Sequence, residues 1–154
     1  MRLFAGILVA VLLLGDAETG HATVRIANDP GGRIGDYVDR FRYWRDSGEF
    51  VIIDGFCAGA CTIVLGAIPH DRICLTPKAK FGFRKASDFN ADGHYVPNPG
   101  ATQALYSVYP PEVKRWIAQR GGLNARMIVL QGKELQRLYR PCSLDAQVAK
   151  SRQQ

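Results

Sequence analysis

A strand, a glycine-rich turn, a helix and a second strand follow one another early in the chain, and this order constrains the fold most. Residues 23–27 alternate as in a strand and run into the turn sequence Asn28-Asp29-Pro30-Gly31-Gly32. Apolar residues then recur at helical spacing over residues 34–44, and Gly48 stands where a helix cap is expected. Residues 50–53 form an apolar run of the buried-strand type that ends at Asp54-Gly55. Together these segments predict a βαβ unit with parallel strands, and therefore the α/β fold class.

The rest of the chain predicts shorter strands followed by a helical final third. Polar, turn-forming sequence over residues 85–99 predicts an exposed loop, of a length typical of lids and binding loops. The other expected elements are a tight turn and short helix over 56–67, strands over 72–75 and 80–83, helices over 101–109, 111–120 and 124–130, and an ordered segment over 133–139. A length of 154 residues with 47% hydrophobic and 22% charged residues suits one domain, which we assign to residues 23–142.

Both ends of the chain are expected to lie outside this domain. Arg2 precedes thirteen apolar or glycine residues, and small residues follow, which is the pattern of a signal peptide over residues 1–22. Cleavage after Ala17 or after Ala22 fits equally well. The apolar run is shorter than the roughly 20 residues that a membrane-spanning helix needs, so export to the periplasm or the medium is favoured over an anchor. Residues 143–154 are polar and predict a disordered tail.

The four cysteines are an even number, which fits two disulfides in an exported protein. They are Cys57, Cys61, Cys74 and Cys142, and four cysteines allow three connectivities. The short separation of Cys57 and Cys61 leads us to expect a distant partner for each rather than a bond between them. No CxxC pair or Cys/His cluster with zinc spacing is present, so neither a metal site nor a cofactor is expected.

A formal net charge of +6 gives the chain a basic surface. The arginines are scattered and no recognition motif is present, so we do not expect nucleic acid as a partner. Attraction to an anionic envelope surface is the alternative that this charge leaves open.

Three segments carry a resemblance to a known family: the turn Asn28 to Gly32, the stretch Asp54-Gly55-Phe56-Cys57-Ala58-Gly59-Ala60-Cys61, and residues 77–84. In order and spacing they resemble the proteolytic subunit of Clp protease and the wider crotonase-like superfamily, over residues 23–86. Small exported bacterial proteins with a similar cysteine-containing stretch look like a closer subgroup. The resemblance implies a core of βαβ units, and relatives that form rings imply that an oligomer is possible.

The chain departs from the family pattern at both side chains that perform catalysis. The resemblance puts the nucleophilic serine at Gly59 and the histidine base at Arg84. Glycine has no nucleophile, and a permanently protonated guanidinium cannot accept a proton. The family's oxyanion hole consists of backbone amides, which fall on Gly32 and Ala60 and do not depend on side-chain identity.

The resemblance therefore implies a protein that binds without cutting. A peptide or acyl carboxylate is the expected ligand, held by the Gly32 and Ala60 amides with help from Arg84, and the loop over 85–99 is a candidate cover. A second hypothesis is an active enzyme whose base is Asp29 or Asp54, although aspartates at such turns usually bond to nearby amides. A cysteine nucleophile at Cys57 or Cys61 is disfavoured by disulfide pairing. A third hypothesis is a structural role in the envelope.

The remaining candidate side chains are assigned no chemistry. His70, His94 and Ser87 fall in expected loops, and His21 lies in the predicted signal peptide.

Overall fold

The predicted βαβ unit is present in a computed structural model, which describes residues 22–143. Strand β1 (Thr23–Asp29) and strand β2 (Phe50–Ala58) pair in parallel, with helix α1 (Ile34–Asp46) between them in the chain. Tyr37 and Phe41 of α1 are buried, as the helical spacing of apolar residues predicts. The predicted signal peptide, except Ala22, and the predicted tail, except Ser143, lie outside the described residues.

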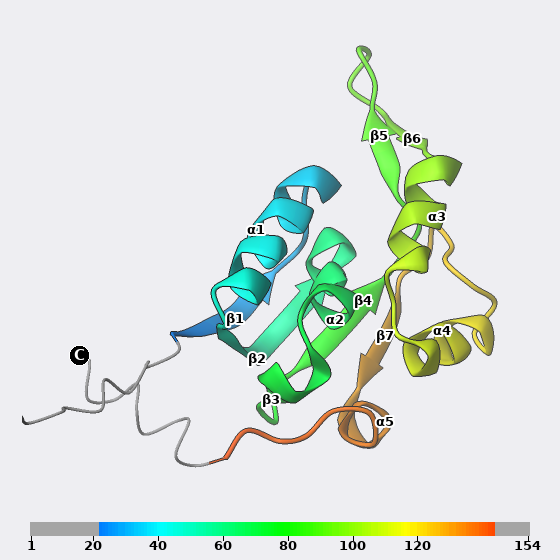
Figure 1. Ribbon diagram of the computed structural model, residues 1–154. Coiled ribbons are helices and arrows are strands. Elements are labelled where there is room, and N and C mark those ends of the chain that lie inside the picture. Colours follow the sequence, from blue (N-terminus) through cyan, green and yellow to red (C-terminus); the bar gives the residue numbers. More distant parts are fainter. Residues whose placement is uncertain (1–21, 144–154) are drawn as a thin grey trace, which may run out of the picture.

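The sheet has five strands and is mostly parallel, which confirms the α/β class (Figure 1). Its order is β1-β2-β4-β7, and β3 pairs with the first half of β2 while β4 pairs with the second half. Only β7 runs antiparallel to its neighbour β4. The bounds of the further strands are β3 (Ile73–Leu75), β4 (Lys80–Phe83) and β7 (Ile128–Gln131), and a separate hairpin contains β5 (Ser87–Phe89) and β6 (Tyr95–Pro97).

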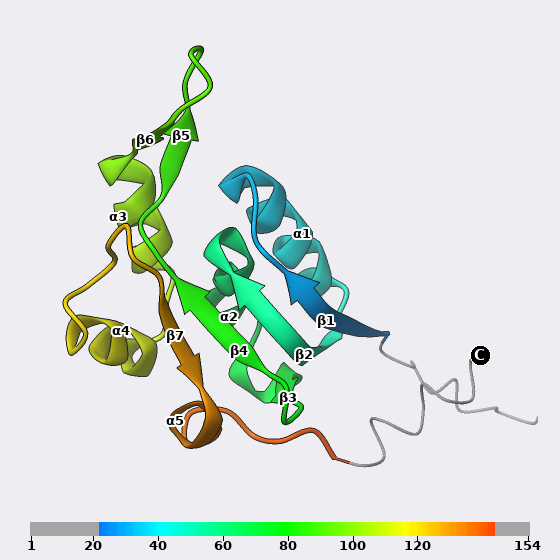
Figure 2. The same ribbon diagram turned by 180° about the vertical axis from the view of Figure 1, so that it is seen from behind.

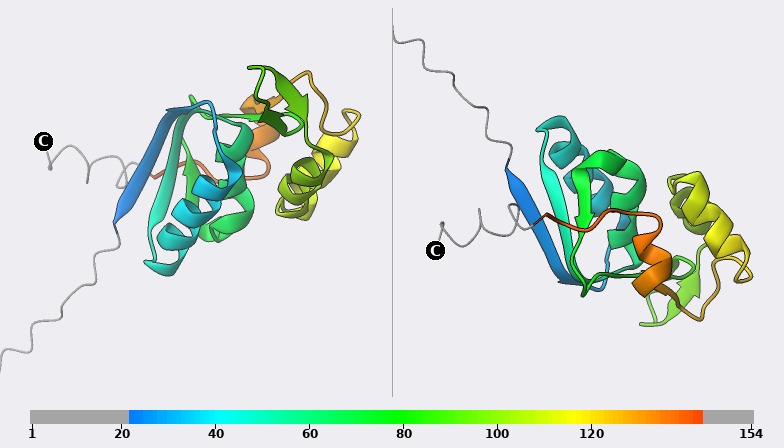
Figure 3. Two further views of the ribbon diagram at one scale, coloured as in Figure 1. Left: turned by 90° about the horizontal axis from the view of Figure 1, so that it is seen from above. Right: turned by 90° about the horizontal axis from the view of Figure 1, so that it is seen from below.

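The helices bury one face of the sheet. Views from above and below show α1 and α2 on the same side of it (Figure 3). Phe83 of β4 packs against Tyr109 and Trp116, with ring centroids 5.2 and 5.7 Å from its own, and this contact joins residues 109–116 to the sheet. The short helices are η1 (Gly59–Ile63), α2 (Val64–Ala67), η2 (His70–Arg72) and α5 (Gly132–Gln136), and the longer ones are α3 (Pro99–Ser107) and α4 (Pro111–Ala118).

Three sequence predictions of local structure were wrong. The helix expected over 124–130 is absent: residues 124–127 are irregular, and residues 128–130 belong to strand β7 because they find backbone partners on β4. The loop expected over 85–99 contains the β5–β6 hairpin, which is exposed as predicted and extends away from the sheet (Figures 1 and 2). Strand β2 does not end at Asp54-Gly55 but continues to Ala58, so the helical segment begins at Gly59.

The segment after α5 is fastened to the end of β3. Leu75 donates its amide to the Arg140 carbonyl at 3.1 Å and accepts one from Cys142 at 2.9 Å. A disulfide between Cys74 and Cys142 closes the same contact. None of the helices within residues 22–143 is long and apolar enough to cross a membrane.

Candidate functional site

The segments that carry the family resemblance meet at one edge of the sheet. Strands β1, β2 and β4 are parallel, so their carboxyl ends lie together, and Figure 2 shows these ends from behind. Asp29 ends the first strand, Gly59 follows the second and Arg84 follows the third. Ligands of open α/β sheets bind outside the carboxyl ends of the strands, so this edge is the candidate site.

The two glycine-containing turns lie directly against each other. Gly31 has a φ of +89°, and a Cβ added there would lie 2.5 Å from the Ala58 carbonyl oxygen and 3.0 Å from the Ala60 nitrogen. Any side chain would push the turns apart, so this contact requires glycine. The next residue, Gly32, is exposed, and within the described residues its amide donates no hydrogen bond to another backbone group.

Gly59 begins η1 with a φ of +55°. A Cβ at this position would lie 3.6 Å from the Pro30 carbonyl oxygen, which is an ordinary contact distance. Space for a side chain therefore exists, and the backbone conformation is the obstacle. Thr62 stabilises the turn. Its hydroxyl donates to the Gly59 carbonyl at 2.6 Å and also bonds to the Tyr109 hydroxyl at 2.6 Å. Burial raises the pKa of that tyrosine.

A disulfide joins Cys57 to Cys61 across the Gly59-Ala60 turn. The expectation that each would pair with a distant cysteine was wrong. It rested on sequence separation alone, but the chain reverses direction after Ala58 and brings the two Cα atoms to 5.3 Å. Both cysteines are fully buried, so neither offers a free thiol.

Arg84 lies at the carboxyl end of β4 and is exposed. Within the described part of the chain its side chain forms no hydrogen bond or ion pair. Its guanidinium is thus available to an anion from solution.

The Asp29 carboxylate is already engaged by neighbouring groups. Its carboxylate accepts the Gly31 amide at 2.9 Å and the Tyr37 hydroxyl, and Arg40 lies 3.6 Å away. Burial, followed by the hydrogen bond to Asp29, raises the pKa of Tyr37 to about 12. The expectation that this aspartate bonds to nearby amides is confirmed.

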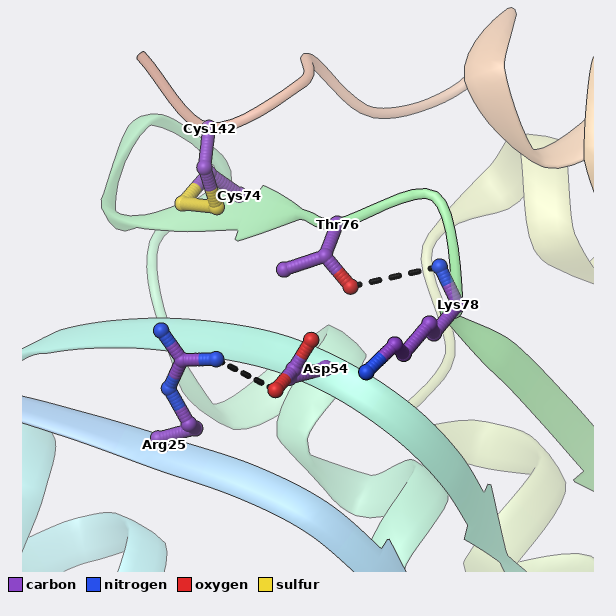
Figure 4. A network of polar contacts seen from close by, with 6 residues as sticks. All are labelled: Arg25, Asp54, Cys74, Thr76, Lys78 and Cys142. Atoms are coloured by element: carbon purple, nitrogen blue, oxygen red, sulfur yellow. Dashed lines mark hydrogen bonds and ion pairs between the residues drawn. A yellow bond between two sulfur atoms is a disulfide. The ribbon is translucent and has the colours of Figure 1, made fainter. Parts of the chain in front are cut away.

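Asp54 does not flank the candidate site. It lies within β2, five residues before Gly59, which corresponds to about 16 Å along a strand. Figure 4 shows it facing Arg25, with which it forms an ion pair, and Lys78. A hydrogen bond from Thr76 and these positive charges lower the pKa of Asp54 despite its partial burial. A general base at neutral pH requires the opposite shift, so neither this pKa direction nor the distance from Gly59 favours Asp54 as the base of an enzyme.

The other candidates are dispersed over the surface. The His70 ring stacks on Tyr139 at 4.5 Å and its Nε2 bonds to the Leu138 carbonyl at 2.7 Å, so these contacts are with the residues that follow α5. His94 and Ser87 are exposed in the hairpin segment. Across residues 22–143 no group of three or more His, Cys, Asp or Glu side chains is placed to hold a metal ion.

The geometry defines an α/β protein with a mostly parallel sheet and two adjoining glycine-containing turns at its carboxyl edge. No family model matches the chain, and no curated protein matches it. Among solved structures it is similar to a ClpP1 mutant from Listeria monocytogenes, with a TM-score of 0.46 and 15% sequence identity. That similarity covers 75% of this chain and 68% of the other.

Proposed function

We propose that this chain is an exported binding protein that holds a peptide or acyl carboxylate at the carboxyl edge of its sheet. The hydrogen-bond donors are the backbone amides of Gly32 and Ala60, and the Arg84 guanidinium supplies a positive charge to the carboxylate. The observation that carries the proposal is the contact of Gly31 with the backbone of Ala58 and Ala60, which brings the two turns together.

Binding without catalysis follows from the residues at the two family positions. Gly59 offers no nucleophile, and both neighbouring cysteines are buried in a disulfide. Arg84 cannot act as a base, whereas its planar fork of donors suits a carboxylate. Backbone amides retain their donor character whatever the side chains are, so anion binding can survive the loss of the catalytic pair.

The proposed location rests on the sequence pattern of residues 1–22 and on the disulfides. Two disulfides with no free cysteine in the described chain are typical of an oxidising, non-cytoplasmic environment. The export signal predicted from the sequence would deliver the chain to such a compartment, either the periplasm or the medium.

We expect Arg84→Glu to weaken carboxylate binding by at least about tenfold, because it replaces a charge-assisted hydrogen bond with repulsion. A calorimetric titration of the oxidised protein with short peptides and acyl acids measures this change in affinity. Arg115→Glu is the matched control, since it makes the same charge change at an exposed position of α4. Equal affinity of the two variants, or no binding across the panel, would contradict the proposal.

We also expect the natural chain to remain unlabelled by a serine-hydrolase activity probe. The comparison is the double variant Gly59→Ser with Arg84→His, which restores the family's nucleophile and base. Position 59 has room for a Cβ, and a serine there would be strained by the φ of +55°. Labelling of the double variant alone would support the assigned positions. Labelling of the natural chain would reveal a nucleophile elsewhere and favour the enzyme hypothesis.

A further inference from the structure

A second polar site lies away from the carboxyl edge, where β1, β2 and the β3–β4 connection meet. A cavity of about 290 Å³ is lined there by Arg25, Asp54, Thr76, Pro77 and Lys78. Figure 4 shows the Arg25 and Lys78 side chains approaching Asp54 from opposite sides. Arg25, Asp54 and the residues from Thr76 to Lys78 are separated in the sequence, and the fold brings them together.

The charges in this cavity do not balance. Arg25 and Lys78 contribute two positive charges, and Asp54 contributes the only negative one among the lining residues. Asp54 forms its ion pair with Arg25, whereas Lys78 makes none with any residue that the structure describes. The cavity therefore holds one excess positive charge, which an anion would neutralise.

Hydrogen-bond donors are also in excess. The Nε atom of Arg25 is buried and has no hydrogen-bond partner within the described residues. A buried donor without an acceptor carries a free-energy cost. Figure 4 shows this atom on the side of the guanidinium that faces away from Asp54 and Lys78, whereas one terminal nitrogen points toward Asp54. Thr76 is already engaged, since its hydroxyl oxygen accepts the Lys78 amide at 3.3 Å.

The loop that carries Lys78 is held in place by its neighbours. Thr76 donates its amide to the Ile53 carbonyl at 2.9 Å, and Ala79 donates to Thr76 at 3.0 Å. The Cys74–Cys142 disulfide fixes the chain two residues before Thr76 (Figure 4). The two cations consequently lie on either side of Asp54, in a cavity whose walls belong to the sheet and to the loop held by these bonds.

We propose that this cavity binds a small molecule through a single oxyanion group, a phosphate or a carboxylate, held by Arg25 and Lys78 beside Asp54. Asp54 orients the Arg25 guanidinium and leaves its remaining donors for the ligand. The volume of about 290 Å³ lies near the lower limit for small-molecule pockets and suits a small group such as a single oxyanion. The site is independent of the proposed carboxylate site, because Asp54 is about 16 Å along β2 from Gly59.

The test is a titration of the oxidised protein with inorganic phosphate and, separately, with acetate, both at constant ionic strength. Backbone amide chemical shifts measured by NMR report the binding. We expect saturable shifts at Thr76 and Lys78 with at least one probe. Lys78→Gln should weaken that binding about tenfold or more, whereas Lys78→Arg should retain it. Lys133→Gln on α5 is the matched control, because it removes the same charge from an exposed residue elsewhere.

The outcomes separate this proposal from the previous one. Saturation by phosphate alone assigns a phosphate-bearing ligand, and saturation by acetate alone assigns a carboxylate. Arg84→Glu should leave these shifts unchanged, even if it abolishes peptide binding. Shifts that fail to saturate with both probes, or that are the same in Lys78→Gln as in Lys133→Gln, would overturn the proposal.

Discussion

Replacement of Gly55 by alanine is expected to destabilise the protein by about 3 kcal/mol or more. A Cβ at Gly55 would lie 1.6 Å from the carbonyl oxygen of Ala27 and 2.7 Å from its carbonyl carbon. These are backbone atoms of the neighbouring strand, at the point where the β1–β2 register shifts between Ile26 and Asn28. The strands would have to separate, because no side-chain rotation can relieve the contact.

Chemical denaturation of the oxidised protein measures this effect. Gly35→Ala is the control, since Gly35 is exposed in α1 and nothing lies within 4 Å of an added Cβ. We expect that variant to be as stable as the natural chain, or up to about 1 kcal/mol more stable, because alanine favours the helix. A loss below about 1 kcal/mol in Gly55→Ala would show that the strands are not paired as described.

Removal of the Cys74–Cys142 disulfide by alanine substitution of both cysteines is expected to lower the free energy of unfolding by about 4 kcal/mol. The bond links positions separated by 68 residues, so it restricts a large part of the unfolded chain. It also holds the backbone hydrogen bonds between Leu75 and the segment after α5. The lower stability should appear as a lower denaturant concentration at the midpoint of unfolding, measured with the other disulfide intact.

The Cys57–Cys61 bond provides the comparison. Its sequence separation is only 4, and the same relation between loop length and entropy predicts a loss of about 2 kcal/mol. Because this bond spans the Gly59-Ala60 turn, its removal should change carboxylate binding at the candidate site more than it changes the free energy of unfolding. Equal losses in the two double variants would contradict the argument from loop length.

The candidate site was partly predictable because its main parts are local. The turn residues Asp29 to Gly32 and the glycine at 59 are visible in the sequence as breakers after apolar strands. Parallel pairing of those strands then brings the turns to one edge. The role of Thr62 in holding Gly59 was missed, because a lone threonine in an apolar segment gives no signal of its partner Tyr109, which lies 47 residues away.

The sequence by itself determined the βαβ unit, the α/β class and the buried face of α1. Each depends on apolar periodicity within about 30 residues, where chain geometry alone decides which side chains share a face. Only the tertiary structure decided that residues 128–131 form a strand, because a short apolar run becomes a strand or a helix according to the partner it meets, here β4. The Cys74–Cys142 bond and the cavity lined by Arg25 and Lys78 were decided at the same level, since both depend on distances between segments that are far apart in the chain.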